Sequence, residues 1–430
     1  MVDHSMNSQG YRYERMPQTK YVYINDVARE TQGKANQKYS LNRILTYLTI
    51  FFFAIGICFV LPIVVNNVTN YLERQLEKAD RQHVPFSDVM EQHFMDFVDT
   101  YKKKYETKEE VIFRQNVFKA NLDETTSHRR SNRLQDATGK VNQFMDLTDQ
   151  EFADAFLMKV HDYGLHKRTN NSFVKPLPKD FKHKKDDVET AEGPLPDFFD
   201  WRDKGLISPV KNQASKPYCY CFAALSAVEA NYAVALAATL PADKKKDMKI
   251  EQFSVQEVLD CDKITAPGDV GGEPGVVFEF IHQNGVESDS LYPYIVGKHN
   301  SCLIHEDSDK VFVKNAYYLH PDENSMLDWL YYYGPISVGI AVPKSMKQPI
   351  DGIYRPTDYE CEHEVLGLHS LVVTGYGTEV DGTKYWIVKN SWGTEWNGDG
   401  YVKFERGRNA CGIEDDAAGI FVDPIKRKHK

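Results

Sequence analysis

The chain has 430 residues, a length that exceeds one ordinary domain and predicts two folded units with additional segments. Hydrophobic residues make up 42% of the sequence and aromatic residues 12%, which suffices for at least one sizeable core. A formal net charge of −10, together with the lack of a long basic patch, argues against nucleic acid as a partner. The composition therefore favours a folded protein that does not act on polyanions.

An uncharged apolar segment, residues 44–65, lies near the N-terminus. Its 22 residues would form about 33 Å of helix, enough to cross a membrane. A cleaved signal peptide and a buried core helix are the alternatives, but the run is long and begins far from the N-terminus for a signal peptide. Lys34, Lys38 and Arg43 precede it, and the seven residues after it contain no Lys or Arg. The positive-inside rule therefore places the tail 1–43 in the cytosol and the rest of the chain in a lumen or outside the cell.

Three regions of different texture follow. Residues 66–174 are charged and helical in pattern, with amphipathic runs at 89–105 and 108–122. Residues 175–194 are rich in Lys, Asp, Glu and Pro, which is typical of an exposed linker that proteases cut. Residues 195–430 combine short apolar strands, Gly-containing turns and many Tyr and Trp, so a mixed α and β domain is expected.

The chain has seven cysteines, and the first, Cys58, falls in the apolar segment. The other six would lie on the oxidising side of the membrane. Disulfides are permitted there, so three bridges among 15 possible pairings would leave no thiol for chemistry.

The stretch KPYCYCFAALSAVEA, residues 216–230, argues against that alternative. Pro217 suits a helix start. An apolar stripe then follows at i, i+4, i+7 and i+11, made of Cys221, Leu225, Val228 and Tyr232. Cys221 is therefore predicted to be a packed thiol. Cys219 points about 200° away from it, in the first turn, where the helix dipole and free N–H groups lower a thiol pKa. Cys219 is the candidate nucleophile.

A thiolate needs a base and a group that orients the base. His369 stands at the entrance to the apolar run 371–374, and Asn390 follows the apolar run 385–388. Side chains at the ends of neighbouring strands can align. A lone His among 14 is more often a surface residue, so the assignment depends on finding its partners.

The order of these residues resembles the papain family of cysteine proteases over most of the chain. FDWRDKGLISPVKNQ, residues 199–213, looks like the start of the mature enzyme. Six residues on from Gln213, without a gap, lies Cys219, where the family has its nucleophile, and Glu229 falls in register as well. The competing frame, with Cys221 as nucleophile, requires a two-residue insertion and displaces Glu229.

The resemblance implies an α+β fold of two domains, a helical left domain and a β-barrel-like right domain, preceded by a helical inhibitory prosegment and one transmembrane helix. It makes His369 the base, Asn390 the group that orients it, Gln213 the oxyanion-hole amide and Trp392 the cover of the His–Asn hydrogen bond. The implied reaction is hydrolysis of peptide bonds in protein or peptide substrates by acyl transfer to the thiol. A monomer without metal or other cofactor is expected.

The prosegment also resembles that family's inhibitory prosegment. Its motif positions are Glu110, Arg114, Phe118, Asn121, Asn142, Phe144 and Asp146. Thr125 and Arg129 depart from the usual Ile and Asn. Asp146 and nearby carboxylates are expected to lose charge-dependent contacts with the cleft as the pH falls toward about 4, which would release the prosegment. Together with the apolar segment, this architecture resembles the falcipain-like branch, type II membrane-anchored zymogens of lysosome-like or food-vacuole-like compartments.

Substrate specificity in this family depends on the pocket for the second residue before the scissile bond. Counting five residues from Cys411 reaches Asp416, the expected pocket floor, and Gly339 is expected on its wall. Three further residues would line the groove: Gly271, Gly272 and Pro274. A small wall residue accommodates Leu, and a carboxylate at the floor also accepts Arg. The alternative is that Asp416 points to solvent, with Asp415 shifting the register.

The resemblance pairs Cys261 with Cys302 and Cys361 with Cys411, leaving Cys219 and Cys221 unbridged. The positions of the family's remaining disulfide are occupied by Lys216 and Asp269, for which we expect an ion pair that partly replaces the covalent link.

Several residues depart from the family pattern near the proposed nucleophile and base: Lys216, Pro217, Tyr218, Tyr220 and Leu368. They leave open the alternative of an attenuated or inactive homologue that serves as a binding protein. Asn67 and Asn170 are glycosylation acceptors by tripeptide pattern.

Overall fold

The computed structural model describes residues 88–131, 141–159, 173–179, 181, 194–245, 247–262, 271–297, 301–305 and 307–428, without the side chains of 127–131. The chain divides into Met1–Ser87 and Asp88–Lys430, and the first unit lies wholly outside the described residues. The predicted membrane segment 44–65 and the acceptors Asn67 and Asn170 are therefore outside them too. One described helix, Cys219–Thr239, is long and apolar enough to cross a membrane, and most of it is buried within the fold.

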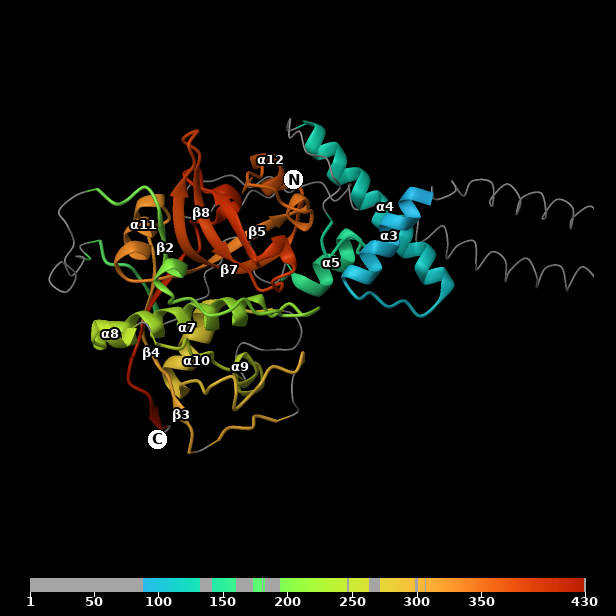
Figure 1. Ribbon diagram of the computed structural model, residues 1–430. Helices are drawn as coiled ribbons and strands as arrows, with labels where there is room; N and C mark the ends of the chain where they lie inside the picture. The colour runs from blue at the N-terminus through green and yellow to red at the C-terminus, as the bar shows by residue number, and fades with distance from the viewer. Residues whose placement is uncertain are drawn as a thin grey trace, which may run out of the picture. The chain divides into compact units, whose positions relative to one another are not determined.

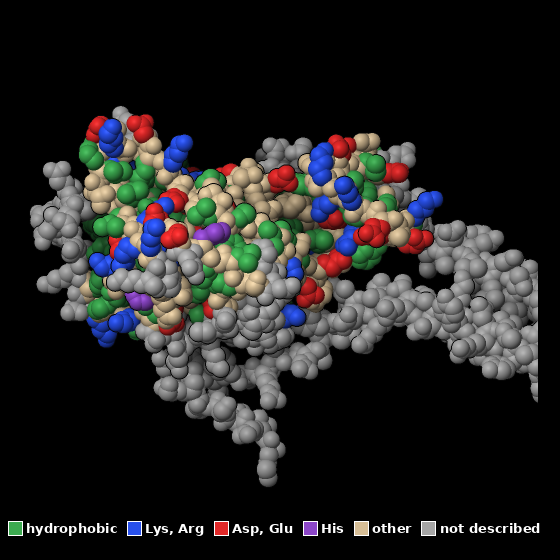
Figure 2. All heavy atoms as spheres, turned by 90° about the horizontal axis from the view of Figure 1, so that it is seen from below, with side chains coloured by type: hydrophobic (Ala, Val, Ile, Leu, Met, Phe, Trp, Pro, Cys, Tyr) green, Lys and Arg blue, Asp and Glu red, His purple; other side chains and the backbone are tan. Residues whose placement is uncertain are grey.

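Three helices make up the predicted prosegment: α3 (Asp88–Thr100), α4 (Lys108–Ser131) and α5 (Asp149–Phe156). Phe118 of α4 packs on Phe94 and Phe97 of α3, with ring centroids 5.6 and 5.0 Å apart. All three rings are buried, so an aromatic core joins the two helices. On the face drawn in Figure 2, acidic and basic side chains are interspersed over this part of the chain.

The predicted amphipathic run 89–105 forms a helix only as far as Thr100. Lys102 has a φ of 52°, which ends the helical path. The turned chain then brings Lys103 Nζ to 2.7 Å from Asp146 Oδ1, and the Tyr105 hydroxyl donates to Asp146 Oδ2 at 3.0 Å. These contacts require the chain to leave the helix, which an amphipathic pattern does not show.

Helix α5 begins with a capping box. The Thr148 hydroxyl accepts from the Glu151 backbone N–H at 3.2 Å, and the Glu151 carboxylate accepts from the Thr148 N–H at 2.8 Å. Arg114 of α4 donates to the same carboxylate at 2.8 Å. Asn121 donates to two backbone carbonyls just before α5. The motif residues therefore hold α4 and α5 together.

The predicted linker 175–194 is bound to the fold at its start. Strand β1 (Val174–Pro176) pairs in parallel with β4 (Val313–Tyr318), and the Phe181 ring lies 5.8 Å from that of Trp329. The side chains of Lys175 and Pro176 are exposed, as the composition predicts, although pairing with β4 fixes their backbone to the fold. Residues 182–193 lie outside the described part.

In the described chain, nine strands form one sheet in the order β1-β4-β10-β5-β7-β8-β9-β6, with β2 on β7. The further bounds are β2 (Phe199–Asp200), β5 (Ile336–Pro343), β6 (Ile353–Tyr354), β7 (Val365–Thr378), β8 (Lys384–Lys389), β9 (Tyr401–Glu405) and β10 (Ala418–Val422). The pairs β1–β4 and β6–β9 are parallel, and the others are antiparallel. A separate pair joins β3 (Asp309–Lys310) to β11 (Arg427–Lys428).

The remaining helices are α7 (Cys219–Thr239), α8 (Ala242–Lys245), α9 (Val255–Cys261), α10 (Pro274–Asn284), α11 (Glu323–Tyr332) and α12 (Asp358–His363). Of these, α7, α9, α10 and α11 contribute buried residues to two hydrophobic cores. The first core gathers α7, α9 and α10, and the second gathers α11 and the inner sheet strands. Figure 1 shows α7 crossing beneath β5, β7 and β8. The predicted α+β class is confirmed.

Two disulfides join described residues, Cys261–Cys302 and Cys361–Cys411, the pairing that the resemblance implied. Cys219 and Cys221 are buried and form no disulfide. Asp269, the expected ion-pair partner of Lys216, lies outside the described residues.

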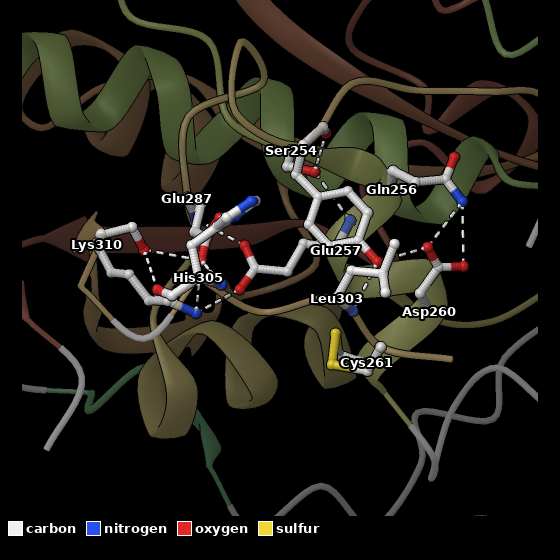
Figure 3. Close-up of a disulfide and its surroundings, with 12 residues drawn as sticks. Ser254, Gln256, Glu257, Asp260, Cys261, Glu287, Leu303, His305 and Lys310 are labelled. Atoms are coloured by element: carbon white, nitrogen blue, oxygen red, sulfur yellow. Dashed lines mark hydrogen bonds and ion pairs between the residues drawn. A yellow bond between two sulfur atoms is a disulfide. The ribbon is translucent and has the colours of Figure 1, made fainter. Parts of the chain in front are cut away.

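Ionisable side chains lie near the first disulfide, and three of them, Glu257, Glu287 and Lys310, are buried (Figure 3). Lys310 Nζ lies 2.5 Å from Glu257 Oε1 and 3.7 Å from Glu287 Oε1, and His305 Nδ1 lies 2.7 Å from Glu287 Oε2. Burial raises the pKa of Glu257. At Glu287 burial acts in the same direction, but the hydrogen bond from His305 and further polar contacts outweigh it and lower the pKa. These contacts fasten the loop after Cys302 to α9.

Candidate active site

Strands β7 and β8 bring His369 and Asn390 together. The two strands are antiparallel, and Asn390 directly follows β8. His369 Nε2 donates to Asn390 Oδ1 at 2.7 Å, and the Ser391 backbone N–H donates to the same oxygen at 2.7 Å. The predicted place of His369 at a strand entrance is wrong, because β7 already begins at Val365 and His369 pairs with Ile340 inside the sheet.

Trp392 covers this hydrogen bond. Its ring centroid lies 4.5 Å from that of His369 with an interplanar angle of 30°, and both side chains are buried. Burial lowers the pKa of His369 to about 4, although the Asn390 contact acts the other way. His369 Nδ1 has no hydrogen-bond partner among the described residues, so it is the ring nitrogen left to exchange a proton.

Cys219 is the first residue of α7, and its side chain is fully buried. Burial raises the pKa of its thiol to about 12, and hydrogen bonds from Ser370, the neighbour of His369, act in the opposite direction without balancing it. The predicted lowering of this pKa at a helix N-terminus is therefore wrong while the prosegment is in place. Loss of water outweighs the helix dipole at this position.

The sequence also predicted that Cys221 packs in the core while Cys219 points away from it, and this contrast is wrong. Helix α7 packs against β7, β10, α9 and α10, so both thiols are fully buried. What distinguishes them is direction. Cys219 contacts Ser370 on β7, and a residue two positions along a helix points about 200° away. Cys221 therefore faces away from the strand that carries His369.

Gln213, the predicted oxyanion-hole residue, is held by Ser391, a residue that the sequence analysis missed. Ser391 Oγ donates to Gln213 Oε1 at 2.7 Å, and the Gln213 N–H donates to Ser391 O at 2.8 Å. Ser391 thus orients both Gln213 and Asn390. Its position next to Asn390 was the available signal, but the contact with Gln213 depends on the fold.

The end of the prosegment occupies the groove beside these residues. Gln213 Nε2 donates to Phe156 O at 3.1 Å. Met158 and Leu368 exchange backbone hydrogen bonds of 2.9 and 2.8 Å, which adds the prosegment to the strand of His369. Leu157 fits against Gly367, where an added Cβ would lie 2.7 Å from the Leu157 Cβ. Residues 156–158 therefore exclude other chains from the groove.

The predicted groove residues Gly271, Gly272 and Pro274 adjoin this segment. Gly271 has a φ of 101°, and a Cβ there would lie 2.6 Å from Met158 Cγ. A Cβ on Gly272 would lie 2.5 Å from the ring of Tyr220. Tyr220, the departure from the expected Trp, therefore packs on a position that requires Gly. Pro274 begins α10 just beyond.

Gly339 and Asp416, the predicted wall and floor of the specificity pocket, are neighbours. A Cβ on Gly339 would lie 3.0 Å from Asp416 Oδ2. Gly339 pairs with Ser370 in the sheet, one residue from His369. Asp416 is half-buried. Its role toward substrate stays a prediction.

Two prosegment carboxylates that the sequence analysis missed, Glu124 and Asp149, pair with lysines of the C-terminal domain. Asp146, the predicted pH-sensitive group, contacts Lys103 and Tyr105 within the prosegment. Asp149 instead pairs with Lys347, whose Nζ also donates to Leu147 O at 3.2 Å. The family pattern marks Asp146 because it holds the prosegment fold. Asp149 is recognisable only when the docked surfaces are seen.

Thr125 stands where the resemblance leads us to expect Ile, and the structure accounts for the exchange. Its side chain is buried, and its hydroxyl donates to Asn121 O at 2.8 Å and contacts Gln348 Oε1. A polar contact across the interface thus replaces apolar packing. The side chain of Arg129 lies outside the described residues.

A buried polar network lies behind the site. It joins three segments of the chain: residues 208–211, helix α7 and the end of β8. Lys389, which precedes Asn390, donates to Ser208 O at 2.8 Å and to Ser226 Oγ of α7 at 2.9 Å. The Ser208 hydroxyl donates to Glu229 of α7 at 2.5 Å, and Lys211 pairs with Glu229 at 2.7 Å. Burial lowers the pKa of Lys389 to about 8, with Glu229 acting the other way.

We expect Glu229→Gln to lower the free energy of unfolding by about 3–5 kcal/mol, because it removes the buried anion that lies 2.7 Å from Lys211 and that offsets the burial of Lys389. Chemical denaturation of the full chain measures this, with Glu362→Gln, 71% exposed, as the control. Between about pH 8 and 10.5 the folded chain binds fewer protons at Lys389 than the unfolded chain, so this group makes stability rise with pH. Equal stabilities of the two variants would contradict the expectation.

Among the described residues, no group of three or more His, Cys, Asp or Glu side chains is arranged to hold a metal ion. The site is built from a thiol, an imidazole and amides.

Comparisons with known proteins agree with this geometry. Residues 195–421 match the model described as papain family cysteine protease. The chain belongs to this family. Residues 94–152 match the cathepsin propeptide inhibitor domain (I29), so the N-terminal helices are an inhibitory prosegment. This papain-family protease is a hydrolase.

Its relatives cover most of its length. The chain is 33% identical to the thiol protease aleurain of Arabidopsis thaliana over 74% of this chain and 81% of that protein. It is 32% identical to cathepsin R of Mus musculus over 77% of this chain and 92% of that protein. The solved structure of digestive procathepsin L2 from Tenebrio molitor larval midgut superposes with a TM-score of 0.64 at 27% identity, covering 77% of this chain and 99% of that one.

Proposed function

We propose that this cysteine endopeptidase zymogen cleaves peptide bonds with Cys219 as nucleophile, His369 as base and then acid, and Asn390 as the group that orients the imidazole. His369 Nδ1 takes the Cys219 proton, and the thiolate forms a bond to the substrate carbonyl carbon. As the C–N bond breaks, His369 gives its proton to the leaving amine. A water molecule then gives a proton to His369 and attacks the acyl carbon, which frees the thiolate.

One observation supports this proposal above the others: the Gln213 amide already donates to a peptide carbonyl, that of Phe156, at 3.1 Å. In a productive complex this amide and the Cys219 backbone N–H would stabilise the oxyanion. Each such donor is worth roughly 2.7–4 kcal/mol in the transition state. The prosegment would occupy the Gln213 amide until the prosegment is removed.

Labelling with an epoxysuccinyl inhibitor tests the proposal. We expect the acid-activated chain to gain one adduct on Cys219, found by peptide mapping, and activity to fall in proportion. The untreated zymogen should label far more slowly. An adduct on Cys221, or an active chain without any adduct, would contradict the assignment. A chain that neither labels nor cleaves would favour the inactive binding-protein alternative.

We also propose that Asp416 and Gly339 form the pocket for the second residue before the scissile bond, with Leu preferred and Arg accepted. Their proximity supports this, since Asp416 Oδ2 would lie 3.0 Å from a Cβ on Gly339. The space that Gly339 leaves admits a branched apolar side chain. The carboxylate offers a partner to a guanidinium that extends past it.

On Asp416→Ala we expect the selectivity for a Leu-Arg over an Arg-Arg reporter peptide to rise about tenfold, because the Arg substrate loses its charge partner. The ratio of kcat/KM values measures this. Asp415→Ala is the control, since Asp415 is the neighbour that could shift the register. A ratio that moves only with Asp415→Ala would assign the pocket to the other carboxylate.

We propose further that residues 44–65 anchor the zymogen in a membrane with the N-terminus cytosolic, and that the protease works in an acidic, lysosome-like or food-vacuole-like vesicle. The 22 uncharged residues and the basic residues before them support this arrangement. Alkaline extraction should leave the full chain in the membrane fraction and release a variant lacking 44–65. Glycosylation at Asn170 would report a lumenal prosegment, and release of the full chain would refute the anchor.

A further inference from the structure

One face of the catalytic domain carries two lysines whose partners belong to the prosegment. Lys344 and Lys347 are the ends of the short helix η2 (Lys344–Lys347) after β5. Lys344 Nζ lies 2.8 Å from Glu124 Oε1 and 3.3 Å from Asp149 Oδ2. Lys347 Nζ pairs with Asp149 Oδ1 and donates to Asn121 Oδ1 at 3.0 Å. In the described part of the chain, neither ammonium group has an acceptor from the catalytic domain.

The same face offers backbone acceptors and an aromatic surface. Lys347 O accepts from Asn142 at 2.9 Å, and Trp392 O accepts from Gln143 at 3.1 Å. The Trp392 ring meets Phe152 of α5 edge to face, with centroids 5.4 Å apart. We call the surface formed by Lys344, Lys347, Gln348 and Trp392 the lysine–tryptophan face.

Removal of the prosegment changes this face sharply. The Lys347 side chain is only 2% exposed in the zymogen, and both lysines would lose all the acceptors described above. Two cations next to an uncovered indole attract a carboxylate joined to an aromatic group. Helix α5 shows how one segment meets both demands: Asp149 is its first residue, and Phe152 follows three residues later.

The face adjoins the site of chemistry. Trp392, which meets Phe152, also stacks on His369 at 4.5 Å. Along the prosegment, Asp149 is seven residues from Phe156, whose carbonyl binds Gln213. Seven helical residues span about 10 Å. One polypeptide can therefore contact the lysines and the cleft at the same time.

We propose that, once the prosegment has been removed, the lysine–tryptophan face binds an acidic segment of protein substrates close to their cleavage site. The segment carries a carboxylate at the start of a helical turn and an aromatic side chain three residues later. This proposal rests on the endopeptidase function proposed above. It adds a second site of substrate recognition, outside the pocket of Asp416.

Kinetics with matched peptides test this. The acid-activated chain, freed of prosegment by gel filtration, is given a short Leu-Arg reporter, the reporter extended by TDQEFADA, and the reporter extended by the neutral TNQQFANA. Extensions are placed on either side of the reporter. We expect the acidic extension on one side to lower KM about tenfold relative to the neutral one, with similar kcat. Most of this difference should disappear in 0.5 M NaCl.

Variants of the full chain give a second measurement. Lys344→Gln combined with Lys347→Gln should remove the advantage of the acidic peptide and leave the short reporter unchanged. Lys384→Gln, an exposed lysine paired with Glu323, is the control and should keep the advantage. If the double variant fails to fold, the comparison of acidic and neutral peptides still decides.

Two results overturn the proposal. One is an equal KM for the acidic and neutral extensions at low salt. The other is an acidic extension that inhibits without being cleaved, which would make the face a docking site for inhibitors only. Absence of cleavage of the short reporter would instead refute the proposed endopeptidase function.

Discussion

Replacing Cys219 by Ala is expected to lower kcat for a peptide substrate by a factor on the order of 10⁶, the loss typical of a removed protease nucleophile. His369 Nδ1 then has no thiol proton to take, and no acyl-enzyme can form. KM should change little, because Cys219 is fully buried behind the groove and the binding surfaces persist. Steady-state assays measure kcat and KM, on chains whose prosegment has been removed by an unrelated protease.

Cys221→Ala is the matched control for this variant. Cys221 is also fully buried, so its loss costs about 1 kcal/mol of stability, but it faces away from β7 and kcat should stay within about twofold of the parent. If Cys221→Ala instead abolished activity and Cys219→Ala did not, the two-residue insertion frame would be the right one. Cys219 would then be the packed thiol.

The second large effect concerns the zymogen. With the prosegment in place, burial raises the pKa of Cys219 to about 12, so the thiol is protonated at pH 7. The His369 pKa of about 4 means that the imidazole is neutral there and offers no cation to a thiolate. We therefore expect alkylation of zymogen Cys219 by iodoacetamide to be very slow at pH 7 and to rise tenfold per pH unit.

Removing residues 156–158 from the groove returns water to the thiol and the imidazole. The desolvation that raises one pKa and lowers the other then falls, and both move toward a thiolate–imidazolium pair. Alkylation at pH 7 should increase by several orders of magnitude on activation. Peptide mapping of Cys219 over a pH series before and after activation measures this. A zymogen rate that levels off below pH 8 would show that the covered thiol is already ionised.

Local pattern was sufficient for the elements that carry the catalytic residues. The run after His369 and the run before Asn390 are apolar because both strands are buried, so each is recognisable without its neighbours. The spacing from Gln213 to Cys219 that marks the candidate nucleophile came from the resemblance, and it could be carried over because both residues lie in one short connected segment. The disulfide partners came from the resemblance rather than from any local pattern.

Other predictions failed because a local sequence pattern contains no information about the distant segments that pack against an element. An apolar stripe on α7 predicted one covered face, but helices and strands from distant parts of the chain bury most of the helix on all sides. The helix N-terminus predicted an acidic thiol, but Met158 and its neighbours exclude the water that would solvate the thiolate. The amphipathic pattern predicted a helix that continues past Thr100, but α3 ends there and the chain turns to contact Asp146.

By itself the sequence indicated a helical prosegment, a helix that starts near Pro217 and the apolar runs beside His369 and Asn390, because these depend on near neighbours. The tertiary structure alone decided which groups meet across long separations: Ser391 with Gln213, Lys389 with Ser208, and Asp149 with Lys347. It also decided the protonation of Cys219 and His369, since a pKa depends on how much water the whole fold leaves around a group.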